Sequence, residues 1–142
     1  MKNIAAIALF LVATFIAAGP ASAQDHAIKA TVPFNFTAGS KILPSGTYTI
    51  AVDMTAPDLL VIRSRDHKDG ALCLGSPNQD KPGSDNTLVF HKYGNQYFLS
   101  DIRSKGTSMN LELPVTKAEK RAKAQVEEAR LPVDSPILIA LN

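Results

Sequence analysis

Apolar and polar residues alternate in short stretches along most of the chain, and polar segments containing glycine or proline separate these stretches. An alternation with a period of two is typical of β-strands that bury one face. The pattern predicts strands at residues 28–36, 47–52, 59–63, 71–74, 107–113 and 137–141, together with a hairpin at 88–102. About seven or eight short strands separated by frequent turns favour a mainly β fold, either an antiparallel β-sandwich or a small barrel.

The hairpin at residues 88–102 is the clearest element of the sequence. Gly94 and Asn95 both tolerate a positive φ, so they can form a two-residue turn between its strands. We expect the more apolar face to join the core, and the second face is half apolar, which indicates that another element covers part of it. The turn predicts the pairs Phe90–Leu99, Lys92–Tyr97 and Leu88–Asp101 on the first face, and Val89–Ser100 and His91–Phe98 on the second.

One C-terminal helix is expected at residues 116–130. Thr116 can cap it, and Glu119 stands at the position that completes a capping box. Its apolar stripe is mostly alanine, which buries little area, so we expect the helix to pack loosely. A solvated helix that only leads to the last strand is one interpretation, and a contact with an acidic surface or an envelope protein is the other. The candidate partner contacts are four cations in its first half: Lys117, Lys120, Arg121 and Lys123.

Residues 1–23 have the three parts of a secretory signal peptide. Lys2 supplies a basic start, residues 4–18 form an apolar run without charge, and residues 21–23 are a small-residue cleavage site. The apolar run is shorter than the ~20 residues that a membrane-spanning helix needs. We therefore expect cleavage between Ala23 and Gln24, a secreted or periplasmic location, no transmembrane span after cleavage, and a single β-rich domain at residues 24–142.

Composition argues against several function classes. The chain has 15 Lys and Arg against 13 Asp and Glu, and its basic residues cluster only in the expected helix, so no nucleic-acid partner is expected. Cys73 is the single cysteine, and its place in the apolar run 71–74 predicts a buried free thiol. His26, His67 and His91 share no zinc-ligand spacing with one another or with Cys73. No cofactor or metal ligand is predicted.

A catalytic arrangement is not recognisable in the sequence either. It contains no Gly-x-Ser-x-Gly motif for a nucleophilic serine. The hairpin register places Asp101 on the opposite face from His91, so these two residues and Ser100 do not form a triad. No catalytic residue is therefore predicted.

Five segments, in this order and spacing, resemble a family of small secreted proteins common in Acidobacteria. The resemblance covers most of the expected mature chain, and it implies an exported protein from that group of bacteria but no activity and no site residue. The segments are Val-Pro-Phe-Asn-Phe at 32–36, Leu-Pro-Ser-Gly-Thr-Tyr at 43–48, Leu-Val-Phe-His-Lys-Tyr-Gly at 88–94, Tyr-Phe-Leu-Ser at 97–100 and Leu-Glu-Leu-Pro at 111–114, followed by a charged helix.

Two functional hypotheses follow from these observations. The first is a non-enzymatic extracytoplasmic module that binds a partner or serves a structural role in the bacterial envelope. The second is a small hydrolase or isomerase with its site in the mouth of a β-barrel near His91. A pocket that contains His91 with a carboxylate within hydrogen-bond reach would favour the enzyme, whereas an exposed surface with an apolar patch would favour the binding module.

Overall fold

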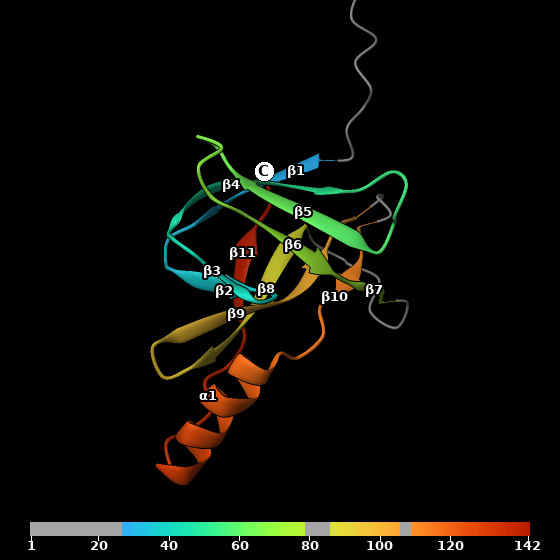
Figure 1. Cartoon of the computed structure of the whole chain (residues 1–142). Coiled ribbons are helices and arrows are strands. Elements are labelled where there is room, and N and C mark those ends of the chain that lie inside the picture. Colours follow the sequence, from blue (N-terminus) through green and yellow to red (C-terminus); the bar gives the residue numbers. More distant parts are fainter. Residues whose placement is uncertain (1–26, 79–85, 106–108) are drawn as a thin grey trace, which may run out of the picture.

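The residues that the structure describes fold into two β-sheets and one helix, a mainly β arrangement as predicted (Figure 1). The computed structural model describes residues 27–78, 86–105 and 109–142. The signal peptide expected at 1–23, its cleavage site and the first part of the strand expected at 107–113 lie outside the described residues. Within those described ranges, no helix is long and apolar enough to cross a membrane.

The first sheet has four antiparallel strands in the order β1-β4-β5-β6. Their bounds are Ala27–Val32 for β1, Gly46–Val52 for β4, Leu59–Ser64 for β5 and Gly70–Leu74 for β6. Alternate residues point inward, as the period-two pattern predicts. On β4, for example, Tyr48 and Ile50 are buried, whereas Thr47, Thr49 and Ala51 on the other side are partly exposed.

The second sheet follows the order β11-β8-β9-β10-β7, and β2 joins β9 through one parallel pair, Thr37 and Phe98. The strands are β2 (Phe36–Ala38), β3 (Lys41–Leu43), β7 (Ser76–Pro77), β8 (Thr87–Tyr93), β9 (Gln96–Arg103), β10 (Leu111–Glu112) and β11 (Ile137–Ala140). The described residues thus form eleven strands rather than seven or eight, because several strands have only two or three residues.

Pro33 divides the strand predicted at 28–36 into two. β1 ends at Val32 in the first sheet, and β2 begins at Phe36 in the second. Proline has no N–H to donate to a strand neighbour, so the pairing stops there and the chain crosses between the sheets. Phe34, in this crossing, stacks on Tyr97 with ring centroids 4.0 Å apart.

The central hairpin forms with one correction to its register. The predicted pairs around the turn are present, including Phe90 with Leu99 and His91 with Phe98. Ser100 is an extra residue in β9, a β-bulge, so Leu88 pairs with Ile102 and Val89 pairs with Asp101. Only Gly94 of the two turn residues has a positive φ.

The bulge also changes the face on which Asp101 lies. Directly paired residues share a face of the sheet, so Asp101 lies on the same side as Val89 and His91. The prediction that Asp101 and His91 occupy opposite faces was therefore wrong. The Asp101 carboxylate accepts hydrogen bonds from Ser100 Oγ at 2.6 Å and Asn78 Nδ2 at 3.4 Å.

The core lies between the two sheets, and the sheets also meet at one edge. Ala30 of β1 forms an isolated antiparallel bridge with Leu141, which follows β11. The largest side chains that are almost completely buried are Tyr48, Phe90, Leu43, Ile50, Leu60, Ile62, Leu88, Ile102, Met109, Leu111 and Val32. Phe90, Leu88 and Leu99 all belong to this core, as the hairpin pattern predicted.

Helix α1 (Lys117–Glu128) lies against β8 and is two residues shorter at its C-terminal end than the expected helix. Thr116 caps it, accepting a hydrogen bond from the Glu119 N–H at 3.2 Å. Glu119, Ala122 and Val126 are its buried residues. The helix is therefore the element that covers part of the second hairpin face, as expected.

Candidate functional site

The outer face of the four-stranded sheet carries exposed side chains of two contrasting kinds. We call it the open face, and it consists of the outward residues of β1, β4, β5 and β6. Leu72 and Leu74 on β6 are 67% and 66% exposed, although leucine is usually buried. Exposed apolar side chains that lie together often mark a binding surface.

The strand register places the apolar residues of the open face together at one end. Leu59 pairs with Leu74, and Val61 pairs with Leu72 and also with Ala51. The β4–β5 turn, at 53–58, adjoins the Leu59–Leu74 pair and carries Met54, which is 89% exposed. We call this part of the face, comprising Ala51, Met54, Leu59, Val61, Leu72 and Leu74, the apolar end.

Cations occupy the next rows along the same strands. Lys29 pairs with Thr49, and Thr49 pairs with Arg63, so the two cations flank one threonine. Arg65 follows Arg63 by two residues, and its backbone N–H donates to the Thr47 carbonyl at 2.9 Å. The side chains of these three cations are exposed. We call Lys29, Arg63 and Arg65 the cationic rows.

Two adjoining hollows lie on the open face, one at the boundary between the apolar end and the cationic rows and one beside the cationic rows. One hollow of about 530 Å³ spans the boundary and is lined by residues that include Ala51, Met54, Val61 and Arg63. The other, of about 480 Å³, is lined by residues that include Lys29 and Arg65. Thr49 and His67 line both hollows. Their volumes are of the size that ligand sites commonly have.

The β5–β6 turn fixes the cationic end of the face. Ser64 Oγ donates to the Asp66 carboxylate at 2.5 Å and accepts from the Asp69 N–H at 3.0 Å. The bond from the Ser64 hydroxyl lowers the pKa of Asp66, and the Lys68 N–H, which donates to the same carboxylate, lowers it further. His67 takes a positive φ of 58° at the tip of the turn, a conformation in which histidine is found more often than most residues. The turn thereby presents His67 to the two hollows.

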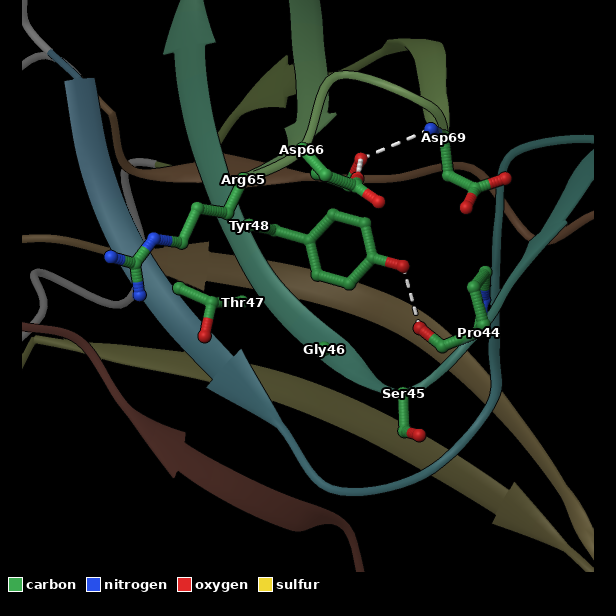
Figure 2. Close-up of a pocket in the computed structure, with 9 residues that line it drawn as sticks. Pro44, Ser45, Gly46, Thr47, Tyr48, Arg65, Asp66 and Asp69 are labelled. Atoms are coloured by element: carbon green, nitrogen blue, oxygen red, sulfur yellow. Dashed lines mark hydrogen bonds between the residues drawn. The ribbon is translucent and has the colours of Figure 1, made fainter.

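A separate cavity of about 500 Å³ lies where the β5–β6 turn meets the segment before β4 (Figure 2). Tyr48 crosses it and donates its hydroxyl to the Pro44 carbonyl at 2.5 Å. Burial raises the pKa of Tyr48, and the nearby carboxylates of Asp69 and Asp66 raise it further. This phenol therefore stays protonated near neutral pH, which makes it a poor base or nucleophile.

Figure 2 also shows that Arg65 points away from Asp66 and Asp69, past Thr47. Asp66 and Asp69 line the Tyr48 cavity, whereas Arg65 lines both this cavity and the hollow beside Lys29. The strands β1, β4, β5 and β6 carry no carboxylate at an outward position, and Asp53, which follows β4, lines the same hollow as Arg63.

His91 meets a carboxylate, but at the helix–sheet contact. Its Nδ1 lies 2.7 Å from Glu119 Oε1, where the His91 side chain is 34% exposed and that of Glu119 is 5% exposed. Tyr93 lies nearby, with a ring centroid 6.2 Å from that of His91, and burial and the charge of Glu119 raise its pKa. The Tyr48 cavity and the two hollows are lined by other residues. The His91–Glu119 pair explains how α1 is positioned on β8.

The four helix cations predicted as partner contacts do not enter this contact with the sheet. Lys117, Lys120, Arg121 and Lys123 are all exposed. Lys123 lies 3.9 Å from the carboxylate of Glu127 one turn later. In Figure 1, α1 lies at the end of the molecule away from β1, β4 and β5, so these cations and the open face are separate surfaces.

Cys73 is buried at 4% exposure on the inward side of β6, as predicted, and is a free thiol. Burial raises its pKa to about 11, so the thiol stays protonated and unreactive near neutral pH. Among the described residues, no three His, Cys, Asp or Glu side chains gather closely enough to hold a metal ion.

Two strands of the four-stranded sheet carried a sequence signal for the open face. Residues 59–62 and 71–74 are apolar on both faces of their strands, which usually indicates a sheet buried on both sides. In the structure Leu72 and Leu74 remain exposed instead. An apolar strand with nothing predicted to cover its second face was therefore the informative feature.

Comparison with protein-family models, with curated proteins and with solved structures finds no match for this chain. The resemblance to the acidobacterial secreted family therefore stays a prediction.

Proposed function

We propose that this protein is a non-enzymatic extracytoplasmic binding module of the bacterial envelope, and that it binds an anionic partner through the open face. The observation that supports the proposal is the pairing of an exposed apolar end with three exposed cations on one sheet. The side chains of Met54, Leu72 and Leu74 are exposed and take no part in the core. Their exposure is understandable if a partner covers them.

The cationic rows indicate that the partner carries negative charge. Lys29 and Arg63 lie on strands two positions apart, so their backbones are about 10 Å from each other. Neighbouring cations repel one another unless an anion sits between them. An anionic group bound over Thr49 would contact both side chains, and Arg65 extends the positive surface by one further row. Binding of this kind weakens as salt concentration rises.

The location in the envelope rests on the signal-peptide pattern of residues 1–23. N-terminal sequencing of the chain recovered from the extracytoplasmic fraction should begin at Gln24. A chain that retains residues 1–23 in that fraction would contradict the proposed processing.

Binding to isolated bacterial envelopes tests the function directly. The exported chain should sediment with the envelopes at low salt. The variant Lys29→Gln/Arg63→Gln/Arg65→Gln should remain in the supernatant. A matched variant, Lys117→Gln/Lys120→Gln/Arg121→Gln, removes the same charge from the helix and should still sediment. Loss of sedimentation with the helix variant alone would transfer the binding site to α1.

The small hydrolase or isomerase near His91 is the second candidate function. The observation that favours it is the 2.7 Å contact between His91 Nδ1 and Glu119 Oε1, which would orient the imidazole as a general base. Hydrolysis of a simple aryl ester by the wild type, lost on His91→Gln with the fold intact, would support this function. Equal rates for the wild type and His91→Gln would remove it.

A further inference from the structure

We propose that the anionic partner is the surface of a lipid bilayer that contains anionic lipid, with the apolar end of the open face seated in its headgroup layer. This inference rests on the proposed function and names the occupant of the same face. The side chains that favour a bilayer are those that project most. Met54 is 89% exposed, and Leu72 and Leu74 are about two-thirds exposed. Side chains that project in this way suit insertion into a soft apolar phase better than enclosure of a small molecule.

The two kinds of side chain lie side by side on the open face. Along a strand, two residues span about 6.6 Å, which separates Val61 from Arg63 on β5. A bilayer that lies along the open face therefore meets the apolar end and the cationic rows together. The apolar side chains then enter the headgroup layer, which is roughly 5–8 Å thick, while the long side chains of Arg63 and Lys29 reach the phosphates.

Asp53 sets a limit to the depth of insertion. Its carboxylate accepts hydrogen bonds from the Thr55 hydroxyl and from the N–H groups of Thr55 and Ala56. These bonds lower the pKa of Asp53, the Thr55 hydroxyl most of all, so it stays ionised. Asp58, at the other end of the same turn, is also exposed. Two carboxylates beside Met54 keep the turn in the hydrated headgroup layer, and only the apolar side chains pass beyond it.

The charge pattern argues against a second copy of this chain as the occupant. If two open faces stacked on each other, the cations of both copies would enter one interface with no acidic residue among the outward positions of β1, β4, β5 and β6. Like charges brought together in this way oppose association. An acidic polypeptide would satisfy the cations, but the projecting apolar end is better matched by acyl chains.

The placement also separates this surface from the helix. α1 lies at the end of the molecule away from β1, β4 and β5 (Figure 1). A flat bilayer that contacts the open face therefore does not reach Lys117, Lys120 and Arg121 at the same time. The helix cations supply an internal control for simple attraction between a positive chain and a negative membrane.

Sedimentation with lipid vesicles tests the inference. The exported chain should bind vesicles of phosphatidylcholine with about a third phosphatidylglycerol and should not bind pure phosphatidylcholine. Lys29→Gln/Arg63→Gln/Arg65→Gln should weaken binding about a hundredfold, because each cation near the surface contributes about fivefold. Leu72→Ser/Leu74→Ser should weaken it by about tenfold or more. Lys117→Gln/Lys120→Gln/Arg121→Gln should bind like the wild type.

A fluorescent label reports insertion independently of affinity. In a Cys73→Ala background, a polarity-sensitive dye on Leu72→Cys should shift to shorter wavelength when anionic vesicles are added. The same dye on Lys120→Cys should not shift. A dye at residue 72 that stays in water while the protein sediments with the vesicles would overturn insertion.

Other binding results would overturn the bilayer inference or the proposed function. Equal binding to neutral and anionic vesicles overturns the inference, as does loss of binding in the helix variant alone. Binding to polyglutamate, or to bacterial envelopes, with no binding to vesicles shows that the partner is not lipid. The proposed function then survives without the bilayer. Absence of binding to both envelopes and vesicles removes the proposed function as well.

Discussion

The outer faces of the two sheets differ in what their apolar side chains do. On the seven-stranded sheet, Val89 and Phe98 lie on the face that α1 partly covers, and both are almost completely buried. On the four-stranded sheet, Leu72 and Leu74 have equally apolar side chains that remain in contact with solvent. The first pair can stabilise the fold, while the second contributes little to it. Apolar character alone therefore does not reveal whether a residue serves stability or binding.

Truncation of one apolar side chain on each face should give the largest contrast. Phe98→Ala removes a side chain that is 2% exposed and should lower the free energy of unfolding by about 3–5 kcal/mol. Leu72→Ala changes a side chain that is 67% exposed and should change stability by less than about 0.5 kcal/mol. Urea denaturation measures both. Similar midpoints for the two variants would contradict the distinction between the faces.

The His91–Glu119 contact should account for the next largest effect. His91→Ala leaves the Glu119 carboxylate nearly buried without this partner and should lower stability by about 2–3 kcal/mol. Adding Glu119→Ala should recover part of that loss, because the unpaired charge is then gone. A double-mutant cycle measures the coupling, and additive effects would show that the contact does not hold α1 on the sheet.

Thiol reactivity at two neighbouring positions of β6 should differ between the inner and outer surfaces of the strand. Cys73 should react slowly with a thiol reagent at pH 8, since the thiol is buried and its pKa is raised to about 11. Leu72→Cys in a Cys73→Ala background should react at once. Comparable rates would show that β6 opens readily.

The same raised pKa makes stability depend on pH. The folded chain holds the Cys73 proton more tightly than the unfolded chain, whose thiol has the ordinary pKa of 9.0. This contribution to stability is complete below about pH 9 and is lost as the pH rises towards 11. In Cys73→Ala that part of the alkaline decline should be absent. Identical pH profiles for the two proteins would contradict the assignment.

The smallest expected effect concerns how tightly α1 packs against the sheet. Ala122 and Val126 are the apolar residues that α1 buries, and they bring little area to the contact. Amide exchange at residues 118–129 should therefore be faster than in β8 and β9. Equal protection in the helix and the hairpin would show that the helix opens only with the whole domain.

Local signals in the sequence determined much of the fold. The alternation at 47–52, the cap at Thr116 and the turn at Gly94 all predicted their elements, since each depends on neighbouring residues. The change of sheet at Pro33 and the bulge at Ser100 were missed. Both depend on which distant strand each segment meets, and a period-two pattern carries no information about that partner.

The candidate site was harder to find for the same reason. Lys29, Arg63 and Leu72 come from three separate strands, and only the antiparallel register brings them onto one face. The helix cations were conspicuous because they are adjacent in sequence. Sequence clustering thus favoured α1, whereas the sheet collected a second positive surface from dispersed residues.

The bridge between Ala30 and Leu141 has a consequence for how fast the chain can fold. It joins the first strand to a residue that follows the last one, and Asn142 N–H donates to the Lys29 carbonyl at 2.8 Å beside it. Contacts between residues so far apart in sequence require a large loop to close before they can form. Chains dominated by such contacts fold in milliseconds to seconds rather than microseconds. We therefore expect the edge that joins the two sheets to close late, after the central hairpin has already formed.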